Sequence, residues 1–163
     1  MTVKLLVETR KGFESDLPLI LSSWLKGAYH FCPAFKDMPK SLYYGVHEPC
    51  LKAIIATSDV MCVVDHEDPD HILGYVIYKD YGFFTVLHWL YIKQQFRGFG
   101  MGAHLLEAIK PKKIVFTTHE TPDSQRYFNK RKLKTCYVPH LRHGEWHIDN
   151  FVTFLQLRGF NET

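Results

Sequence analysis

The sequence is poor in the features that mark several large classes of protein. It has four cysteines in 163 residues, Cys32, Cys50, Cys62 and Cys136, and no Cys-x-x-Cys pair. This scatter is typical of reduced, mostly buried thiols, and it argues against a disulfide framework or a cysteine zinc site. The sequence also lacks a run of about twenty apolar residues, so we expect no membrane-spanning helix.

The N-terminal segment lacks the long apolar core of a signal peptide. Its apolar residues are interrupted by Glu8, Arg10 and Lys11 before such a core develops. We therefore expect the protein to stay in the compartment where it is made, the cytoplasm.

The sequence does contain enough apolar material for a folded domain. Hydrophobic residues make up 46% of the chain and aromatic residues 15%, which excludes a disordered protein. The length is that of one domain, so we expect residues 1–163 to form a single unit. The formal net charge of +3 is small and does not by itself indicate a nucleic-acid partner.

The first third of the chain predicts one strand and two helices. Val3–Glu8 is a short run of strand formers. Over Glu14–Tyr29, apolar residues recur at three- and four-residue spacing, which is typical of an amphipathic helix. An aromatic loop over Tyr29–Pro39 then leads to a second helix over Ser41–Thr57, with Ser41 as its expected cap.

The rest of the chain predicts a hairpin followed by alternating strands and helices. Val60–Val64 and Ile72–Tyr78 flank a turn and predict the hairpin, and Phe83–Ile92 predicts a third strand. The later expected elements are a helix over Met101–Ile109, a strand over Lys113–Thr117, a helix over Pro122–Lys132, a strand over Lys134–Val138 and a candidate last strand over Asn150–Leu157. The order β-α-α-β-β-β-α-β-α-β-(β) predicts an α/β (α+β) fold with a mixed sheet flanked by helices.

The most informative segment joins the third strand of this set to the next helix. Gln95–Ala103 reads Gln-Phe-Arg-Gly-Phe-Gly-Met-Gly-Ala. Glycines adopt dihedral angles that a Cβ forbids and let the backbone approach a ligand closely. A helix start adds unpaired N–H groups and the positive end of the helix dipole. The segment therefore predicts a site for a phosphate-bearing ligand, with a flexible turn as the alternative.

Two common phosphate loops do not match this segment. The Walker pattern requires Gly-Lys-Ser/Thr, whereas Gly102 is followed by Ala103 and His104. The dinucleotide fingerprint requires Gly-x-Gly-x-x-Gly early in a βαβ unit. The present loop reads Gly-x-Gly-x-Gly and lies past the middle of the chain.

The loop resembles the acetyl-coenzyme A (acetyl-CoA) loop of the GCN5-related N-acetyltransferase (GNAT) superfamily, whose motif is Gln/Arg-x-x-Gly-x-Gly/Ala. Gln95, Gly98 and Gly100 match it. The order of elements also resembles the family's mixed, mostly antiparallel sheet. A Ser-Trp-Leu run in the first helix resembles short members from bacteriophages, for which the compartment would be the host cytoplasm.

The resemblance implies an acetyl-CoA-dependent N-acyltransferase in which an amine acceptor attacks the thioester directly. Many relatives are homodimers, so a dimer is an expectation. The strand before the loop would splay from its parallel neighbour to admit the pantetheine arm. The implied coenzyme-binding residues are Ile92, Gln95, Arg97, Gly98, Phe99, Gly100, Met101, Gly102, Ala103 and Phe128.

The catalytic residues are less well defined by the sequence. His88 lies on the strand that the resemblance predicts to splay, and its imidazole suits a general base near neutral pH. Strict alternation would put it on the same face as Leu90 and Ile92; the alternative is a buried structural histidine. Where relatives often have a Tyr as general acid, this chain has Phe128, so the adjacent Tyr127 or solvent would have to replace that acid.

Phe128 and a basic run also motivate an alternative function. That run comprises Arg126, Lys130, Arg131, Lys132 and Lys134. It could be a solvated helix face, meet the 3′-phosphate of the coenzyme, or contact nucleic acid. The alternative is a non-catalytic module of the same fold that binds nucleic acid or a protein partner. A third alternative is an enzyme of the same fold that modifies a nucleic-acid base.

Two further groups concern the acceptor and a metal. An aromatic set is expected to line the acceptor entrance: Tyr29, Phe31, Phe35, Tyr43 and Tyr44. Three histidines follow, His140, His143 and His147, but their spacing matches no strong zinc pattern, so we predict no metal site.

Overall fold

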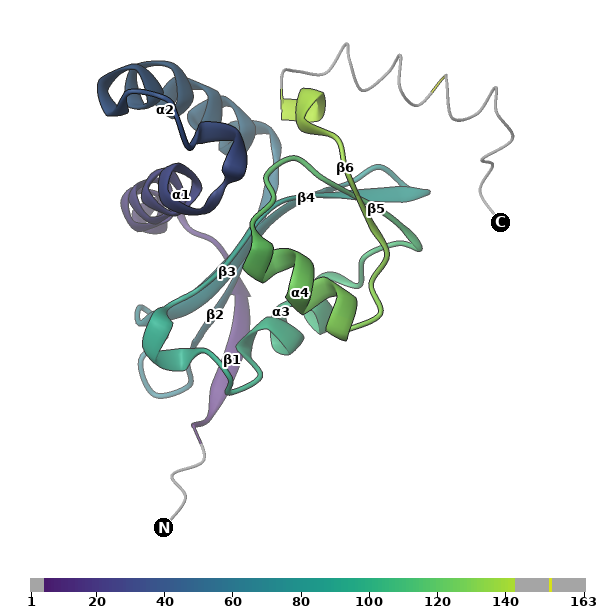
Figure 1. The fold of residues 1–163 in the computed structure, drawn as a ribbon. Coiled ribbons are helices and arrows are strands. Elements are labelled where there is room, and N and C mark those ends of the chain that lie inside the picture. The colour runs from purple at the N-terminus through teal and green to yellow at the C-terminus, as the bar shows by residue number, and fades with distance from the viewer. Residues whose placement is uncertain (1–4, 143–152, 154–163) are drawn as a thin grey trace.

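Among the residues that the structure describes, six strands form one sheet, and their order across the sheet is their order along the chain (Figure 1). The computed structural model describes residues 5–142 and 153. The strands are β1 (Val7–Lys11), β2 (Asp59–Asp65), β3 (Ile72–Asp80), β4 (Phe84–Ile92), β5 (Ile114–Thr117) and β6 (Thr135–Tyr137). Strands β1 to β4 are antiparallel, whereas β5 runs parallel to β4 and β6 runs parallel to β5. The expected mixed, mostly antiparallel sheet is confirmed.

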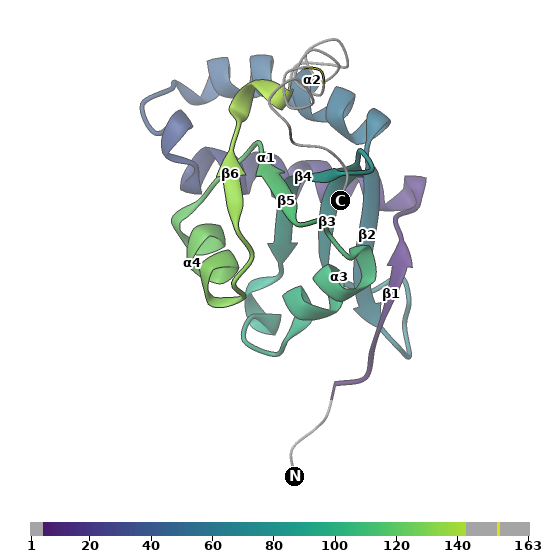
Figure 2. The same ribbon diagram turned by 90° about the vertical axis from the view of Figure 1, so that its right-hand side faces the viewer.

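In the continuously described part of the chain, residues 5–142, four helices pack on the two faces of the sheet (Figure 2). They are α1 (Leu17–Phe31), α2 (Lys40–Thr57), α3 (Met101–Ile109) and α4 (Pro122–Lys130). Short 3-10 turns lie at η1 (Glu14–Asp16), η2 (Pro33–Phe35), η3 (Gln94–Phe96) and η4 (Pro139–Arg142). Among the described residues, no helix is long and apolar enough to cross a membrane.

Helices α1 and α2 share a core with one face of the sheet. Trp24 of α1 and Leu51 of α2 are fully buried beside Tyr75 and Ile77 of β3. Helix α1 approaches β4 closely at Gly27, where a Cβ would lie 2.8 Å from Cζ2 of Trp89. A glycine is therefore required at this contact between the helix and the sheet.

Helices α3 and α4 cover the opposite face. Leu105 of α3 and Phe128 of α4 are buried against Val76 and Leu87 of the sheet. A third buried cluster lies at the Phe84 end of β4, beside β5. It consists of Phe84, Val86, Phe116, Val138 and Leu141. The sheet is thus apolar on both faces.

The structure corrects several predicted boundaries. Strand β1 is Val7–Lys11, because pairing with β2, and not local apolar content, fixes this edge strand; of the predicted Val3–Glu8, Leu5 and Leu6 precede the strand and residues 3–4 lie outside the described residues. Ser41 does not cap α2, which begins at Lys40 after Pro39. The predicted last strand, Asn150–Leu157, lies outside the described residues apart from Thr153.

An ion pair connects β1 to the start of α1. The Asp16 carboxylate accepts hydrogen bonds from Nη1 of Arg10 at 2.7 Å and from Nη2 at 3.1 Å, and a third from the Phe13 N–H at 2.7 Å. Asp16 is 7% exposed. The hydrogen bonds from Arg10, and then the one from Phe13, hold the pKa of Asp16 below its ordinary value despite burial.

Replacing Asp16 by asparagine should lower the free energy of unfolding at neutral pH by about 2 kcal/mol, because Arg10 loses a buried charged partner. Since the pKa of Asp16 is depressed in the folded state, its contribution is present above the ordinary carboxyl pKa and is lost as the pH falls through the native value. The difference between wild type and Asp16→Asn should therefore shrink in acid. Urea unfolding at pH 7 and pH 3 measures this difference.

Glu48→Gln is the matched control, because Glu48 pairs with Lys52 on the exposed surface of α2. It should change the free energy of unfolding by less than about 0.5 kcal/mol at either pH. An equal loss in both variants at pH 7 would contradict the stabilising role of the Arg10–Asp16 pair.

Candidate active site

The parallel strands β4 and β5 pair over only part of their length. Their register runs from Phe84 opposite Ile114 to Leu87 opposite Thr117. One further hydrogen bond joins the Thr118 N–H to the Leu87 carbonyl at 3.4 Å. Within the described part of the chain, the rest of β4 has no partner strand on this side. The expected splay is therefore present.

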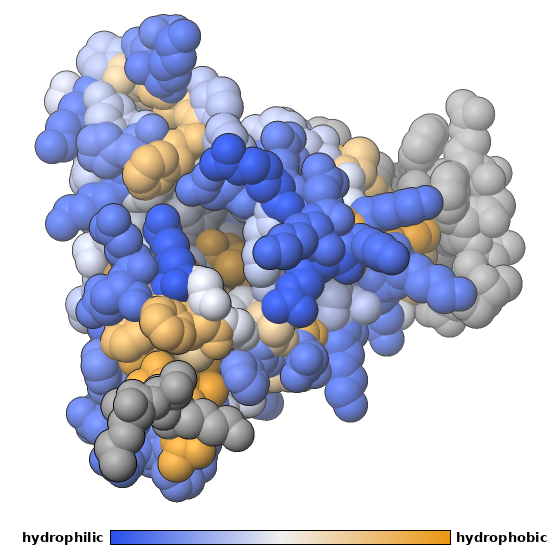
Figure 3. Space-filling view, turned by 60° about the horizontal axis from the view of Figure 1, so that its bottom comes forward, coloured by the Kyte–Doolittle hydropathy of each residue, from blue (hydrophilic) through white to orange (hydrophobic). Residues whose placement is uncertain are grey.

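A cavity of about 600 Å³ opens where these two strands part. Its walls come from the second half of β4, the glycine loop, the segment after β5 and helix α4. In the space-filling view, a hollow with an apolar floor lies between hydrophilic rims (Figure 3). The cavity joins segments that lie far apart in the sequence.

The glycine loop has the conformation that its sequence predicts. Gly98 has φ +85° and Gly100 has φ +84°, a region that L-residues other than glycine rarely adopt. A Cβ built on either residue would meet no atom within 4 Å. Hydrogen bonding within α3 begins when Ala103 and His104 donate to the Gly100 carbonyl. The backbone N–H groups just before them lie at the helix start, where a helix offers no acceptors of its own.

Most of the residues predicted to bind the coenzyme line this cavity. They are Ile92, Arg97, Gly98, Gly100, Met101, Gly102 and Phe128. Arg97 donates from Nε to the Ile92 carbonyl at 3.1 Å, which connects the loop to the end of β4. The two predicted catalytic residues, His88 and Tyr127, line the same cavity.

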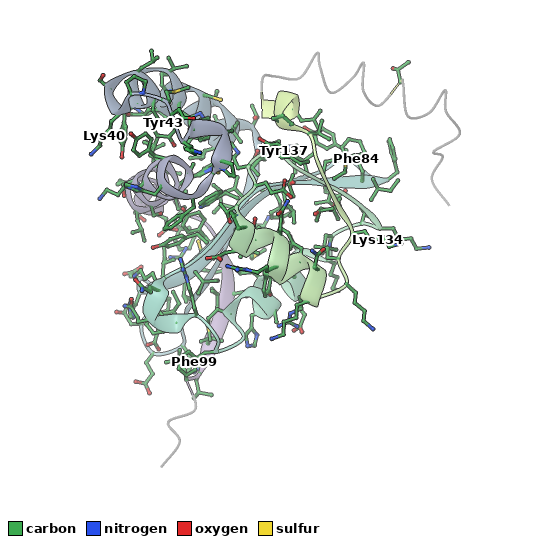
Figure 4. The ribbon with its side chains drawn as sticks, viewed as in Figure 1. Lys40, Tyr43, Phe84, Phe99, Lys134 and Tyr137 are labelled. Atoms are coloured by element: carbon green, nitrogen blue, oxygen red, sulfur yellow. The ribbon has the colours of Figure 1, made fainter. Side chains whose placement is uncertain are left out.

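Three of the predicted residues do not line it. Gln95 is exposed in η3. Phe99 is 67% exposed, and its side chain lies at the end of the molecule, away from the sheet (Figure 4). Ala103 lies beside a separate shallow pocket with Leu106 and Lys110. The motif fixes the backbone of the loop, but the direction of each side chain depends on the turn geometry.

Tyr127 packs directly against the glycine loop. A Cβ on Gly102 would lie 2.5 Å from the Tyr127 hydroxyl oxygen. That oxygen is buried, and the Arg131 guanidinium lies beside the Tyr127 ring, with its carbon 5.6 Å from the ring centroid. Burial raises the pKa of the Tyr127 hydroxyl, so it keeps its proton at neutral pH. Phe128, the next residue, belongs to the core under α3.

A β-bulge at His88 positions this side chain. Tyr78 of β3 pairs with Leu87 and Ile77 pairs with Trp89, which leaves His88 as the extra residue on β4. The alternation that would place His88 with Leu90 is therefore interrupted at this position. His88 is 4% exposed, and its Nδ1 lies 2.9 Å from Oγ1 of Thr118 in the segment after β5.

The structure adds polar residues that sequence reasoning missed. Oγ1 of Thr118 also lies 3.1 Å from Nδ1 of His119, and Nε2 of His119 lies 3.0 Å from Nε2 of His47 on α2. His119 lines the cavity as well. The available signal was the run Thr117-Thr118-His119 at the carboxyl end of a parallel strand, where ligand sites of open sheets concentrate. No signal connected it to His47.

The predicted aromatic acceptor lining is largely wrong. Of that set, only Phe31 lines the cavity. Phe35 and Tyr43 are buried in the core with α1 and α2, and Tyr43 donates to the Leu25 carbonyl at 2.8 Å (Figure 4). The sequence pattern could not distinguish aromatic residues that join two helices from aromatic residues that face a ligand.

The basic run is divided by the end of α4. Lys130 and Arg131 line the cavity, whereas Arg126 pairs with Asp123 on the exposed surface. Among the described residues, no group of three or more metal-binding side chains occurs. Two of the three histidines considered for a metal site, His143 and His147, lie outside those residues.

The backbone conformations of Gly100 and Gly45 predict that alanine at these two positions changes the free energy of unfolding in opposite directions. Gly100→Ala should lower the free energy of unfolding by about 1 kcal/mol, because alanine is strained at positive φ even where space is open. Gly45→Ala, at an exposed position inside α2, should raise it by a few tenths to about 1 kcal/mol. Urea unfolding measures both. A stabilising Gly100→Ala would contradict the left-handed loop.

Comparison with known proteins agrees with this geometry. The family model described as Acetyltransferase (GNAT) family matches residues 24–131. A structure from Pyrococcus furiosus assigned as an acetyl transferase has 14% identity and a TM-score of 0.61, and the match covers 82% of this chain and 96% of that chain. A GCN5-related N-acetyltransferase from Rhodopseudomonas palustris has 11% identity and a TM-score of 0.55, covering 80% and 83%.

A third structure, described as a possible acetyltransferase from Clostridium difficile 630, has 14% identity and a TM-score of 0.53, covering 80% of this chain and 92% of that chain. At these identities the solved structures show a common fold. A search of the curated proteins found no match. The family model covers about two thirds of the sequence, including the glycine loop and the splayed strands, and on this basis the chain belongs to the acetyltransferase (GNAT) family.

Proposed function

We propose that this protein is an acetyl-CoA-dependent N-acyltransferase in which an amine acceptor attacks the thioester directly. Membership of the acetyltransferase family supports acyl transfer in general. The observation that carries the proposal is the cavity between β4 and β5, which the glycine loop and the His88 bulge both line. One cavity thus combines a cradle for phosphates with a candidate base.

The residues around the loop fit the coenzyme. The buried Tyr127 hydroxyl lies against Gly102, and its neighbour Arg131 has no acceptor, so the hydroxyl proton is available to an oxygen of the pyrophosphate. The open space over Gly98 and Gly100 leaves room for that group, with the N–H groups at the start of α3 as further donors. Lys130 and Arg131 line the same cavity and suit the 3′-phosphate better than a nucleic-acid backbone.

The unpaired half of β4 suits the pantetheine arm. Trp89, Leu90 and Tyr91 belong to a strand whose edge lacks a partner strand among the described residues. Amide groups of an extended arm could hydrogen-bond to such an edge as an added strand does. The bound coenzyme supplies an activated acyl group, and the chain orients it between the strands.

His88 is the proposed general base. An amine is mostly protonated at neutral pH, and it must lose a proton before it can attack a carbonyl carbon. The imidazole of His88 lines the cavity and is held through Nδ1 by Thr118, so Nε2 is the nitrogen through which it would accept that proton. The acceptor itself is an amine whose identity we leave open.

Acetyl-CoA should raise the melting temperature of the purified protein, because a ligand that binds only the folded state stabilises it. At a concentration a hundredfold above Kd, the rise should be about 5–10 °C. Gly100→Asp should abolish the shift, since it adds bulk and negative charge where the pyrophosphate would lie. Differential scanning fluorimetry measures both effects.

Gly45→Asp is the matched control, because it introduces the same side chain at an exposed position of α2. It should keep the full acetyl-CoA shift. If wild-type protein shows no shift at millimolar acetyl-CoA, the proposed function fails. Release of free thiol in the presence of a panel of amines then separates an enzyme from a non-catalytic binding module.

Tyr127→Phe distinguishes two roles for this hydroxyl. The contact with Gly102 favours a role in binding, so the KM for acetyl-CoA should rise about fivefold to tenfold while kcat changes little. Steady-state kinetics with an amine identified from the panel measures both constants. A large fall in kcat with an unchanged KM would instead support Tyr127 as the general acid.

A further inference from the structure

Four buried polar side chains form a continuous chain from the cavity into helix α2. It runs from His88 through Oγ1 of Thr118 to His119 and then to His47, with separations of 2.9, 3.1 and 3.0 Å between the facing atoms. The exposed fraction of each of these residues is 6% or less. They come from the bulge of β4, the segment after β5 and the middle of α2.

Aromatic rings surround the inner end of this chain. The ring of Trp24 meets His119 edge-on with centroids 5.1 Å apart, and Phe35 and Tyr43 lie 4.6 and 5.0 Å from the ring of His47. Such surroundings keep water away from His47, whereas His119 also borders the cavity. Burying three polar rings among aromatic residues is costly unless they hydrogen-bond, and here they hydrogen-bond in series.

The order of donors and acceptors in the chain can run in two directions. Between the two Nε2 atoms, one nitrogen carries the proton and the other accepts it. A hydroxyl has a single proton, so it can donate to one of its two imidazole neighbours and accept from the other. A change of protonation at one end therefore reverses every hydrogen bond up to the other end.

We propose that His88, Thr118, His119 and His47 form a proton relay that carries the acceptor's proton from the cavity to His47. This inference rests on the proposed function and extends it to how the base is coupled to the protein interior. His88 is the catalytic residue. Thr118, His119 and His47 act through it and are positioning residues.

The transfer is balanced at every atom. The N–H bond of the protonated amine breaks and an N–H bond forms at Nε2 of His88. The proton on Nδ1 of His88 moves to Oγ1 of Thr118, whose own proton moves to Nδ1 of His119. The proton on Nε2 of His119 moves to Nε2 of His47, which becomes an imidazolium. No electrons are gained or lost.

The reverse movement closes the cycle. Each proton steps back, His47 becomes neutral again, and Nε2 of His88 gives its proton to the departing thiolate. One further proton, from the nitrogen of the new amide, leaves to solvent. The relay thus provides the acid that Phe128 cannot provide, because the proton taken from the amine is kept on His47 until the thiolate forms.

The relay predicts that a substitution at His47 changes the protonation of His88 at the other end of the relay. With ¹⁵N-labelled histidines, the ring-nitrogen shifts of His88 should change in His47→Phe, a variant that retains an aromatic ring beside Phe35 and Tyr43. In a Thr118→Val background the same substitution should leave His88 unchanged, because the path is broken. Nuclear magnetic resonance measures these shifts without any acceptor.

Tyr43→Phe is the matched control for damage to the core. It removes a buried hydroxyl beside His47 but no member of the relay, so His88 should keep its wild-type shifts. If His47→Phe alters the ring-nitrogen shifts of His119 while those of His88 stay unchanged, the relay is wrong. Should a variant not fold, the wild-type spectrum decides: a scalar coupling between the two Nε2 atoms supports the relay, and its absence overturns it.

Turnover provides a second readout. With an amine identified from the panel, His47→Phe and Thr118→Val should each lower kcat about tenfold or more, and the double variant should lose no more than either one. The acetyl-CoA melting shift should persist in all three. Additive losses would overturn the relay. A wild-type protein that binds no acetyl-CoA would instead overturn the proposed function and leave the nuclear magnetic resonance result as it stands.

Discussion

The parting of β4 from β5 beyond Leu87 and Thr117 is the constraint on which the rest of the site depends. Parallel strands that stayed paired would leave no space between the glycine loop and α4. Because they part, the second half of β4 has no partner strand on one side among the described residues, while β3 still pairs with it on the other. The cavity, the bulge at His88 and the buried polar chain all lie at this point.

The two faces of the sheet contribute different parts of the site. Helices α3 and α4 carry the loop, the Tyr127 hydroxyl and the cavity-lining cations, and they make a region suited to phosphates. Helices α1 and α2 bring Trp24 and His47 to the opposite face. His88, at the bulge of β4, lines the cavity and contacts Thr118, which leads to His47. We infer that the donor is held from one side and the proton is handled from the other.

The order of elements and the conformation of the glycine loop could be predicted from the sequence because both rest on local signals. Glycines at 98 and 100 encode the left-handed turns directly, and hydrophobic periodicity encodes the helices and strands. The bulge could not be predicted, since it is a property of the register between β3 and β4. His47 and His119 are 72 residues apart, and only tertiary packing brings them together.

The remaining errors have the same cause. Phe99 lies inside the motif but is exposed outside the cavity, and Tyr43 carries an aromatic ring that is buried in the core with α1. Residue type indicated the chemistry that each side chain offers, whereas tertiary packing determined whether the side chain faces the cavity, the core or solvent. Local patterns located the glycine loop, where we propose that the backbone itself binds the ligand.

A crystal structure with coenzyme A bound tests the central claim most directly. The account predicts density for the pantetheine arm between β4 and β5, with the pyrophosphate on the backbone from Gly98 to Gly102 and within hydrogen-bond distance of the Tyr127 hydroxyl. The sulfur should lie on the side of the cavity that His88 lines. Coenzyme bound elsewhere, or a cavity filled by the chain's own residues, would contradict it.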